Sequence, residues 1–215
     1  MGLKNQYIII PSPLDEKAIQ NELTEQAQNL PPAKYARILA ERKAKAVASN
    51  ILLLLQNNGA STAQEEPLIN ATEGNDGTIS IQKYIIGCDT IVAVDEEILE
   101  KPMDDNDARY MLSRLSGRWH NVHTGISIYS STNSYESPIT SFTETAKVKF
   151  TVLTPDDIDA YIRTREHVDK AGSYGIQGIG GQLIESIKGD YYTVIGLPMH
   201  RFSRELANII NSSTV

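Results

Sequence analysis

A carboxylate lies inside an apolar segment, where a buried charge is unfavourable unless it has a partner or a chemical role. Asp89 belongs to the run Gly87-Cys88-Asp89-Thr90, within residues 84–94, whose continuous apolar and β-branched character predicts a buried strand. Spacing alone leaves two interpretations open. Asp89 either caps a turn or pairs with a lysine for structural reasons, or it activates water or holds a metal ion.

Two lysines stand where an anionic ligand could meet them. Lys101 lies in a Glu-Lys-Pro run just before a helix predicted over residues 104–115, and phosphate groups bind at helix N-termini. Lys43 borders the apolar stripe of a helix predicted over residues 33–55. The alternative for both is a solvated surface lysine. For the other basic residues of the helix predicted over residues 33–55, which are Arg37, Arg42 and Lys45, we expect a solvated helix face.

A glycine-rich segment over residues 169–178, with the sequence DKAGSYGIQG, is a third candidate. It is not the dinucleotide-binding fingerprint, because that motif opens a helix directly after a strand. Glycine nevertheless lets the backbone approach a ligand closely. Gln177 carries amide donors and an acceptor with which it could read the edge of a base. A plain turn is the alternative.

Composition and charge exclude several classes of protein. The chain has 215 residues, of which 40% are hydrophobic and 22% charged, so it is neither collagen-like nor a coiled coil nor globally disordered. The formal net charge of −7 argues against a long nucleic acid as partner. The N-terminus does not predict a secretory signal, and no apolar run reaches about 18 residues, so we expect a cytoplasmic protein without a membrane partner.

Cysteine and histidine usage argues against soft-metal and disulfide chemistry. The single cysteine, Cys88, permits neither an intramolecular disulfide nor a Cys-based zinc site, and its apolar surroundings predict a small core residue. His120 and His123 are three residues apart in a segment that predicts a loop leading into a strand. We expect them to be core or surface histidines rather than metal ligands.

The order of predicted elements indicates an α/β fold with a single domain over residues 1–215. Strands are predicted over residues 6–10, 84–94, 98–99, 123–129, 141–152 and 191–195, and helices over residues 33–55, 104–115, 154–161 and 198–211. Residues 60–78, rich in Gly, Asn, Thr and Glu without periodicity, are expected to form an exposed insertion loop.

Two long segments together resemble the Maf family of nucleoside triphosphate pyrophosphatases. They are GCDTIVAVDEEILEKPMDDNDARYMLSRLSGRWHNVHTGISIY and DKAGSYGIQGIGGQLIESIKGDYYTVIGLP, and LDE at residues 14–16 and LAERKA at residues 39–44 are similar to earlier family landmarks. The resemblance extends from about Tyr7 to Leu206. It implies a mixed sheet flanked by helices, as in inosine triphosphatases, with a cleft for the nucleotide. It also implies hydrolysis between the α- and β-phosphates.

The resemblance implies a role for six residues. Asp89 matches the proton acceptor that activates water, and Glu16 matches an acidic residue that, with Asp89, holds a divalent cation such as Mg²⁺ or Mn²⁺. Lys43 and Lys101 match phosphate-contacting lysines. Thr90 and Gln177 match positions linked to base choice, and their identities resemble the branch that acts on dTTP and UTP.

One family motif is not found in this sequence. The SxSPRR motif, whose arginines bind phosphates, has no counterpart, so we expect this form to be weaker than one that carries the motif. Two other functions stay open: a nucleotide-binding relative without turnover, and an enzyme of the inosine triphosphate pyrophosphatase class. The partner expected in every case is a nucleoside triphosphate, and a homodimer is left open.

Overall fold

The computed structural model describes residues 9–15, 18–19, 22–23, 30–57, 70–73 and 79–212. Its helices are α2 (Pro32–Asn57), α3 (Asp105–Leu115), α4 (Pro155–Arg163), α5 (Tyr191–Val194) and α6 (Met199–Ser212). Its strands are β1 (Asn70–Glu73), β2 (Ile79–Gln82), β3 (Tyr84–Val94), β4 (Glu97–Leu99), β5 (Trp119–Ser130), β6 (Thr140–Phe150) and β7 (Ile184–Lys188). Short 3₁₀ turns lie at η1 (Ser131–Asn133), η2 (Ala171–Ser173) and η3 (Ile179–Leu183).

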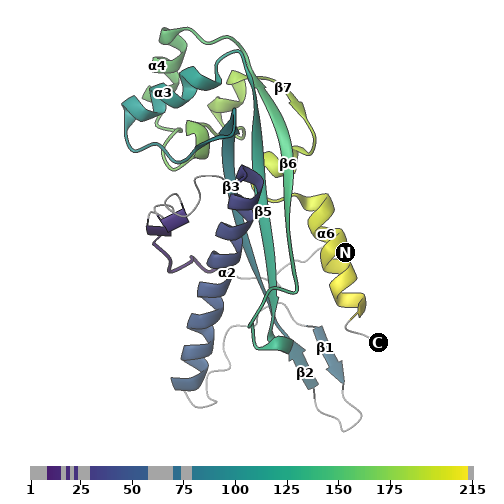
Figure 1. The fold of residues 1–215 in the computed structure, drawn as a ribbon. Coiled ribbons are helices and arrows are strands. Elements are labelled where there is room, and N and C mark those ends of the chain that lie inside the picture. The colour runs from purple at the N-terminus through teal and green to yellow at the C-terminus, as the bar shows by residue number, and fades with distance from the viewer. Residues whose placement is uncertain are drawn as a thin grey trace.

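A five-stranded sheet in the order β4-β3-β5-β6-β7 forms the centre of the molecule. Helix α2 covers one face, α6 covers the other, and α3 and α4 lie together at one end (Figure 1). This arrangement confirms the predicted α/β class. Within the described residues every strand pair is antiparallel, so the parallel pairs of the predicted mixed sheet are not among them. Short connections such as η1 between β5 and β6 favour antiparallel neighbours.

Helix α2 lies close on the sheet because small residues meet there. Ala36, Ala40 and Ala44 are buried along one face of the helix. A Cβ at Gly87 on β3 would overlap the carbonyl oxygen of Ala40, and a Cβ at Gly125 on β5 would overlap that of Ala36. Any larger residue at either glycine would therefore push the helix away. This close approach fixes where the polar edge of α2 meets β3.

Alternation along β3 divides its side chains between two faces. Ile91 packs with Tyr35 and Leu39 beneath α2, on the same face as Gly87. Cys88 packs with Phe202 and other residues on the α6 side. Strand β4 pairs with β3 only at residues 92–94, so the part of β3 that carries Asp89 and Thr90 lies beyond the described pairing with β4.

Several predicted elements are confirmed by the capping groups that delimit them. Strand β3 has the predicted bounds, and β4 includes the predicted return strand at 98–99. The Asp104 side chain accepts hydrogen bonds from two backbone N–H groups of the first turn of α3. Thr154 and Asp157 form a capping box that begins α4, with Pro155 at the first helical position.

Other predictions need correction. The strand predicted over 191–195 is wrong: these residues begin the short helix α5, because the Asp190 side chain caps the N–H of Tyr192. Strand β7 was not predicted. The loop predicted over 60–78 contains β1, which backbone pairing with β2 stabilises without an apolar pattern, and its other residues lie outside the described ones. Of the strand predicted over 6–10, only Ile9 and Ile10 are described, and neither is in a strand.

Among the described residues, no helix combines the length and the apolar character that crossing a membrane requires. The longest, α2, carries charged residues among its apolar ones. The closing helix α6 is amphipathic and directs Phe202 and Leu206 onto Ile126, Ile128 and Phe142 of the sheet.

Candidate active site

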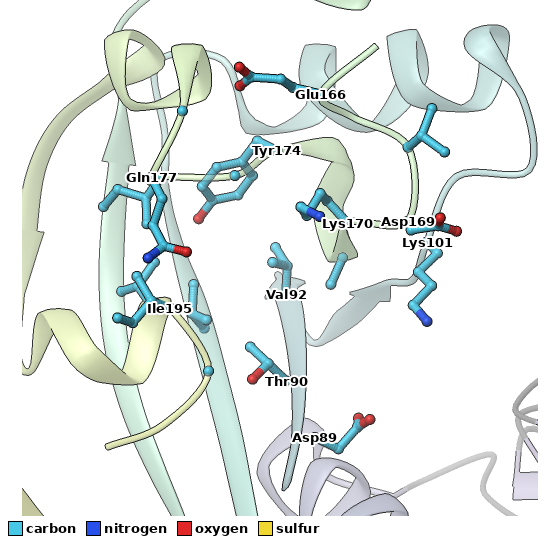
Figure 2. Close-up of a pocket in the computed structure, with 18 of the residues that line it drawn as sticks. Asp89, Thr90, Val92, Lys101, Glu166, Asp169, Lys170, Tyr174, Gln177 and Ile195 are labelled. Carbon is cyan, nitrogen blue, oxygen red and sulfur yellow. The ribbon is translucent and has the colours of Figure 1, made fainter. Parts of the chain in front are cut away.

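A cavity of about 800 Å³ lies beside the part of β3 that carries Asp89 and Thr90. It brings together five of the six residues to which the sequence assigns a role: Lys43, Asp89, Thr90, Lys101 and Gln177. Figure 2 shows Asp89 and Thr90 directed to opposite sides of their strand, with the glycine-rich segment above them. The cavity therefore reaches both faces of the sheet edge. The sixth residue, Glu16, lies outside the described residues.

Asp89 forms an ion pair with Lys43 at the charged end of the cavity. The side chains keep exposed fractions of only 11% and 19%, so the pair lies in a partly desolvated environment. Asp89 comes from β3 and Lys43 from α2, 46 residues apart, and the glycine contacts described above hold those elements together. The two interpretations of Asp89 are thus compatible: it pairs with a lysine and it faces a cavity.

Lys101 and Glu100 continue this charged end after β4. Glu100 accepts a hydrogen bond from the Tyr35 hydroxyl at 2.6 Å, and both Glu100 and Lys101 line the cavity. Burial, and then the hydrogen bond and charge of Glu100, raise the pKa of Tyr35, so this hydroxyl stays a proton donor to the carboxylate. This hydrogen bond fixes the position of the Glu100 side chain, one residue before Lys101.

Uncharged groups form the cavity wall beside Thr90. Thr90 Oγ1 lies 2.8 Å from Thr124 Oγ1 on the neighbouring strand β5, and the Thr124 hydroxyl donates to the Thr193 carbonyl oxygen at 2.7 Å. Ile195 and Gly196 complete this wall. Gly196 has a φ of +102°, which only glycine adopts without strain.

The glycine-rich segment holds Gln177 over this uncharged wall (Figure 2). Gly172, with a φ of +64°, donates its N–H to the Glu100 carbonyl oxygen at 3.2 Å and touches Val92 so closely that a Cβ would clash. Glu166 accepts the N–H of Gly180 at 3.2 Å. The segment is therefore more than a plain turn, because these hydrogen bonds and contacts hold it in one conformation. They fix the position of the backbone that carries Gln177.

The thiol of Cys88 is not a candidate nucleophile. It is half-buried and donates to the Gly196 carbonyl oxygen at 2.6 Å. Burial, and then the charge of Asp89, raise the pKa of Cys88 to about 12, so the thiolate is scarcely populated near neutral pH. The prediction of a small core residue needs one correction: Cys88 packs against the core but is only half-buried, and it lines the cavity.

The two histidines are core residues, as predicted. His120 Nε2 lies 2.8 Å from the Tyr174 hydroxyl, and His123 Nδ1 lies 2.8 Å from Thr145 Oγ1. Burial lowers the pKa of His120 to about 4 and also lowers that of His123. Within the part of the chain that the structure describes, no group of three or more His, Cys, Asp or Glu side chains is arranged as a metal site.

The solvated-face prediction needs correction, because the other three basic residues considered on α2 are half-buried and all have hydrogen-bond partners. Arg37 pairs with Glu41 one turn away, and Arg42 makes two hydrogen bonds to Glu22. Lys45 donates to two backbone carbonyl oxygens in the turn after β5. Of the four basic residues considered on this helix, Lys43 alone lines the cavity.

Sequence reasoning missed part of the lining. The missed polar residues are Glu100, Arg165, Glu166, Asp169 and Lys170. Lys170 and Asp169 stood in the quoted glycine-rich segment, and a charge next to such a segment was a usable signal. The sequence did not point to the wall formed by Val194, Ile195 and Gly196, because the first two residues were assigned to a strand that ended before Gly196.

Comparison with known proteins places this site in a family. A family model described as Maf-like protein matches residues 1–209. The "Probable bifunctional dTTP/UTP pyrophosphatase/methyltransferase protein" of Homo sapiens is 41% identical over 151 residues, which are 69% of this chain and 24% of that protein. Proteins named "dTTP/UTP pyrophosphatase" from Bacillus cytotoxicus and Clostridium novyi are 48% and 47% identical over 125 and 117 residues.

The matched segments cover 58% and 54% of this chain and 63% and 60% of the two bacterial proteins. The chain thus spans less than two thirds of the length of these relatives.

Proposed function

Because the chain belongs to the Maf family, we propose that it hydrolyses dTTP and UTP to the nucleoside monophosphate and pyrophosphate. The relatives named dTTP/UTP pyrophosphatase support this choice of substrates. The observation that carries the proposal is a single cavity lined by Asp89, Lys43 and Lys101 together with Thr90 and Gln177. Such a cavity suits a ligand with an anionic tail and an uncharged polar head.

Asp89 is proposed to accept the proton of the attacking water. As the water oxygen bonds to phosphorus, its proton passes to the carboxylate, the anhydride P–O bond breaks, and pyrophosphate leaves with the bonding electrons. The Lys43 ammonium compensates the negative charge of Asp89 before substrate arrives. An ammonium has three donors, so Lys43 can hold Asp89 and contact a phosphate oxygen at once. Lys101 is proposed to contact the phosphates from the end of β4.

The donor set suits a divalent cation with hard oxygen ligands. Mg²⁺ at phosphate-transfer sites is usually held by one or two carboxylates together with the substrate's own phosphates. Asp89 lines the cavity as a carboxylate, and we propose that Asp89 and Glu16 hold Mg²⁺ or Mn²⁺. When bound, the ion neutralises phosphate charge and polarises the bond to be cleaved.

The first test is pyrophosphate release from dTTP and UTP, compared between the wild type and Asp89→Asn. The amide is nearly isosteric but cannot accept the proton, so kcat should fall by about 10²–10⁴-fold while triphosphate binding survives. Asp95→Asn is the matched control, because Asp95 lies at the end of the same strand, is exposed and pairs with Arg118 outside the cavity.

Three outcomes would contradict the proposal. Orthophosphate as the first product would exclude cleavage between the α- and β-phosphates. A kcat for Asp89→Asn close to that of the wild type would remove Asp89 from the role of base. Binding of dTTP without release of either product would instead support a nucleotide-binding protein without turnover.

A further inference from the structure

The turn that follows Gln177 begins without a capping side chain of its own. Gly178 is the N-cap residue of η3, and its carbonyl oxygen accepts the N–H of Gly181 at 3.1 Å. An N-cap side chain usually accepts an N–H of the first turn, because those groups have no partner within the helix. Glycine has no side chain, so this acceptor has to come from elsewhere in the chain.

Glu166 supplies the acceptor from 14 residues earlier. Its Oε2 accepts the N–H of Gly180, the second residue of η3, at 3.2 Å. A Cβ at Gly178 would overlap Glu166 Oε2 and lie 2.7 Å from the carboxylate carbon, so the carboxylate fills the space of the absent side chain. Figure 2 shows Glu166 directed toward the side of the cavity on which Gln177 lies. The glycine and the distant carboxylate therefore form one cap, divided between two positions.

The two residues that flank Glu166 attach its loop to helix α3. Arg165 Nη1 donates to Asp105 Oδ1 at 2.9 Å, and His167 Nε2 lies 3.1 Å from the same oxygen. An ionised carboxylate only accepts hydrogen bonds, so Nε2 donates this one. The Arg165 pair is exposed and contributes little, whereas the His167 ring has an exposed fraction of 2% and is held in place. Asp105 thereby fixes the loop from which Glu166 reaches η3.

The backbone of this loop needs such contacts. Arg165 has a φ of +66°, a left-handed conformation that is unfavourable for a residue with a Cβ. Thr164 Oγ1 accepts the N–H of Glu166 at 3.2 Å and helps to turn the chain after α4. A strained conformation persists only where its surroundings hold it. The position of Glu166 therefore depends on the hydrogen bonds to Asp105.

We propose that Glu166 is a positioning residue that provides the missing cap of η3, and that Asp105 holds Glu166 in place. The capped turn begins directly after Gln177, which lines the cavity. The kinetic part of the inference rests on the proposed function, since it takes the cavity as the substrate site. Gln177 lies well away from Asp89 (Figure 2). Loss of the cap should therefore weaken substrate binding more than it slows the chemical step.

The test measures kcat and KM for UTP in Glu166→Ala and Glu166→Gln. Glu166→Ala removes the acceptor, so KM should rise roughly 10-fold, as for the loss of one hydrogen bond, with kcat within about threefold of the wild type. Glu166→Gln keeps a carbonyl oxygen for the Gly180 N–H, so its KM should stay within about threefold. Glu185→Ala is the matched control, because Glu185 is exposed, pairs with Lys149 and does not line the cavity.

A folded Glu166→Ala with the wild-type KM would overturn the proposal. An equal loss of kcat in Glu166→Ala and Glu166→Gln would also overturn it, because the charge of the carboxylate would then act on the reaction directly.

A double-mutant cycle tests the fit between positions 166 and 178. Gly178→Ala alone should push the Glu166 carboxylate aside and raise KM about as much as Glu166→Ala does. In Glu166→Ala the space is empty, so adding Gly178→Ala should change KM by less than about twofold. The φ of Gly178 is −111°, which alanine adopts readily. Two effects on KM that simply multiply would contradict a divided cap.

Asp105 acts one step further away, so its replacement should have a smaller effect. Asp105→Ala should raise KM about threefold, and Asp105→Asn, which keeps an Oδ1 acceptor, should restore most of the loss. Asp159→Ala is the control, because Asp159 also joins α4 to α3, through Arg109 at 2.7 Å, and does not line the cavity. A wild-type KM in Asp105→Ala would exclude Asp105 from this role.

Hydrogen exchange measured by mass spectrometry keeps the inference distinct from the proposed function. Peptides that span residues 176–183 should exchange at least about 10-fold faster in Glu166→Ala than in the wild type or Glu166→Gln, while peptides of β5 stay unchanged. If no triphosphate is hydrolysed, the proposed function fails, but this pattern still supports the cap. Unchanged exchange in Glu166→Ala would overturn the cap even in an active enzyme.

Discussion

The two faces of β3 build two different halves of one cavity. On the α2 face, Asp89 meets Lys43 as full charges held close together. On the opposite face, Thr90 meets Thr124 through neutral hydroxyl groups that lie 2.8 Å apart. The charged half offers strong but weakly directional attraction, which suits phosphate oxygens. The neutral half offers direction with little charge, which suits the discrimination of bases. The split indicates that affinity for the phosphates and choice of base can be changed separately.

Among the changes that test the two halves separately, removing the cation of the charged half should have the largest effect. Lys43→Met keeps the aliphatic stem but removes the ammonium that pairs with Asp89, and with it a charge-assisted contact to phosphate. We expect kcat/KM for UTP to fall by about 10²–10³-fold, with the UTP-to-CTP ratio of kcat/KM unchanged. Lys45→Met is the control, because Lys45 lies on the same helix but bonds to backbone carbonyls away from the cavity.

A change in the UTP-to-CTP ratio in Lys43→Met would break the comparison, since the charged half would then take part in base choice. Unchanged kcat/KM would instead leave Lys43 as a structural partner of Asp89.

Acidification should have an intermediate effect, which is a loss of folding stability through a residue that supports the neutral half. His120 supports that half through the Tyr174 hydroxyl, which lies 2.8 Å from Nε2, and Tyr174 lines the cavity. Burial lowers the pKa of His120 from 6.5 to about 4. Because the unfolded chain binds this proton more readily than the folded chain, stability is full above about pH 6.5 and declines as the pH falls toward 4.

The expected loss from this group is roughly 3 kcal/mol across that range. Thermal melts between pH 7 and pH 4 should show a steeper decline for the wild type than for His120→Gln, whose amide does not titrate there. His200→Gln, at an exposed position, controls for the loss of a histidine. Parallel pH profiles for the wild type and His120→Gln would show that His120 does not produce this dependence.

The sequence predicts the elements that depend on local chemistry. Strand β3 follows from its continuous apolar run, and α3 and α4 follow from the capping groups Asp104 and Thr154. The four-residue helix α5 was mistaken for a strand because its aromatic and β-branched residues favour strands, while the cap by Asp190 decides the local conformation.

The contacts that make the site lie beyond such local reasoning. Lys43 reaches Asp89 only because α2 lies close on Gly87 and Gly125, and neither glycine identifies its partner helix in the sequence. Nothing in the sequence pointed to Thr124 either, because its contact with Thr90 depends on the strand register that sets the two residues opposite each other. The resemblance was enough to assign residues to the cavity. The division of the cavity into two halves follows from the elements that pack on each face of β3, and only the structure gives those.

The smallest effect is expected at Cys88, which touches both halves. The charge of Asp89 contributes to its raised pKa of about 12, and its thiol donates to the Gly196 carbonyl oxygen beside Thr90. A neutral thiol has no part in proton transfer near pH 7, and a serine hydroxyl can donate to the same carbonyl. Cys88→Ser should therefore keep kcat/KM for UTP and the UTP-to-CTP ratio within about twofold.

Cys88→Ala removes the donor and leaves the Gly196 carbonyl oxygen without it. A typical hydrogen bond contributes about 1 kcal/mol, so the UTP-to-CTP ratio should fall by a few-fold at most, while kcat for UTP stays near the wild-type value. Iodoacetamide should modify the wild type only slowly at pH 7, because the thiolate is scarce. A large loss of kcat in Cys88→Ser, or rapid alkylation that stops turnover, would show that the thiol takes part in the charged half after all. The two halves would then be joined through Cys88 rather than separated by β3.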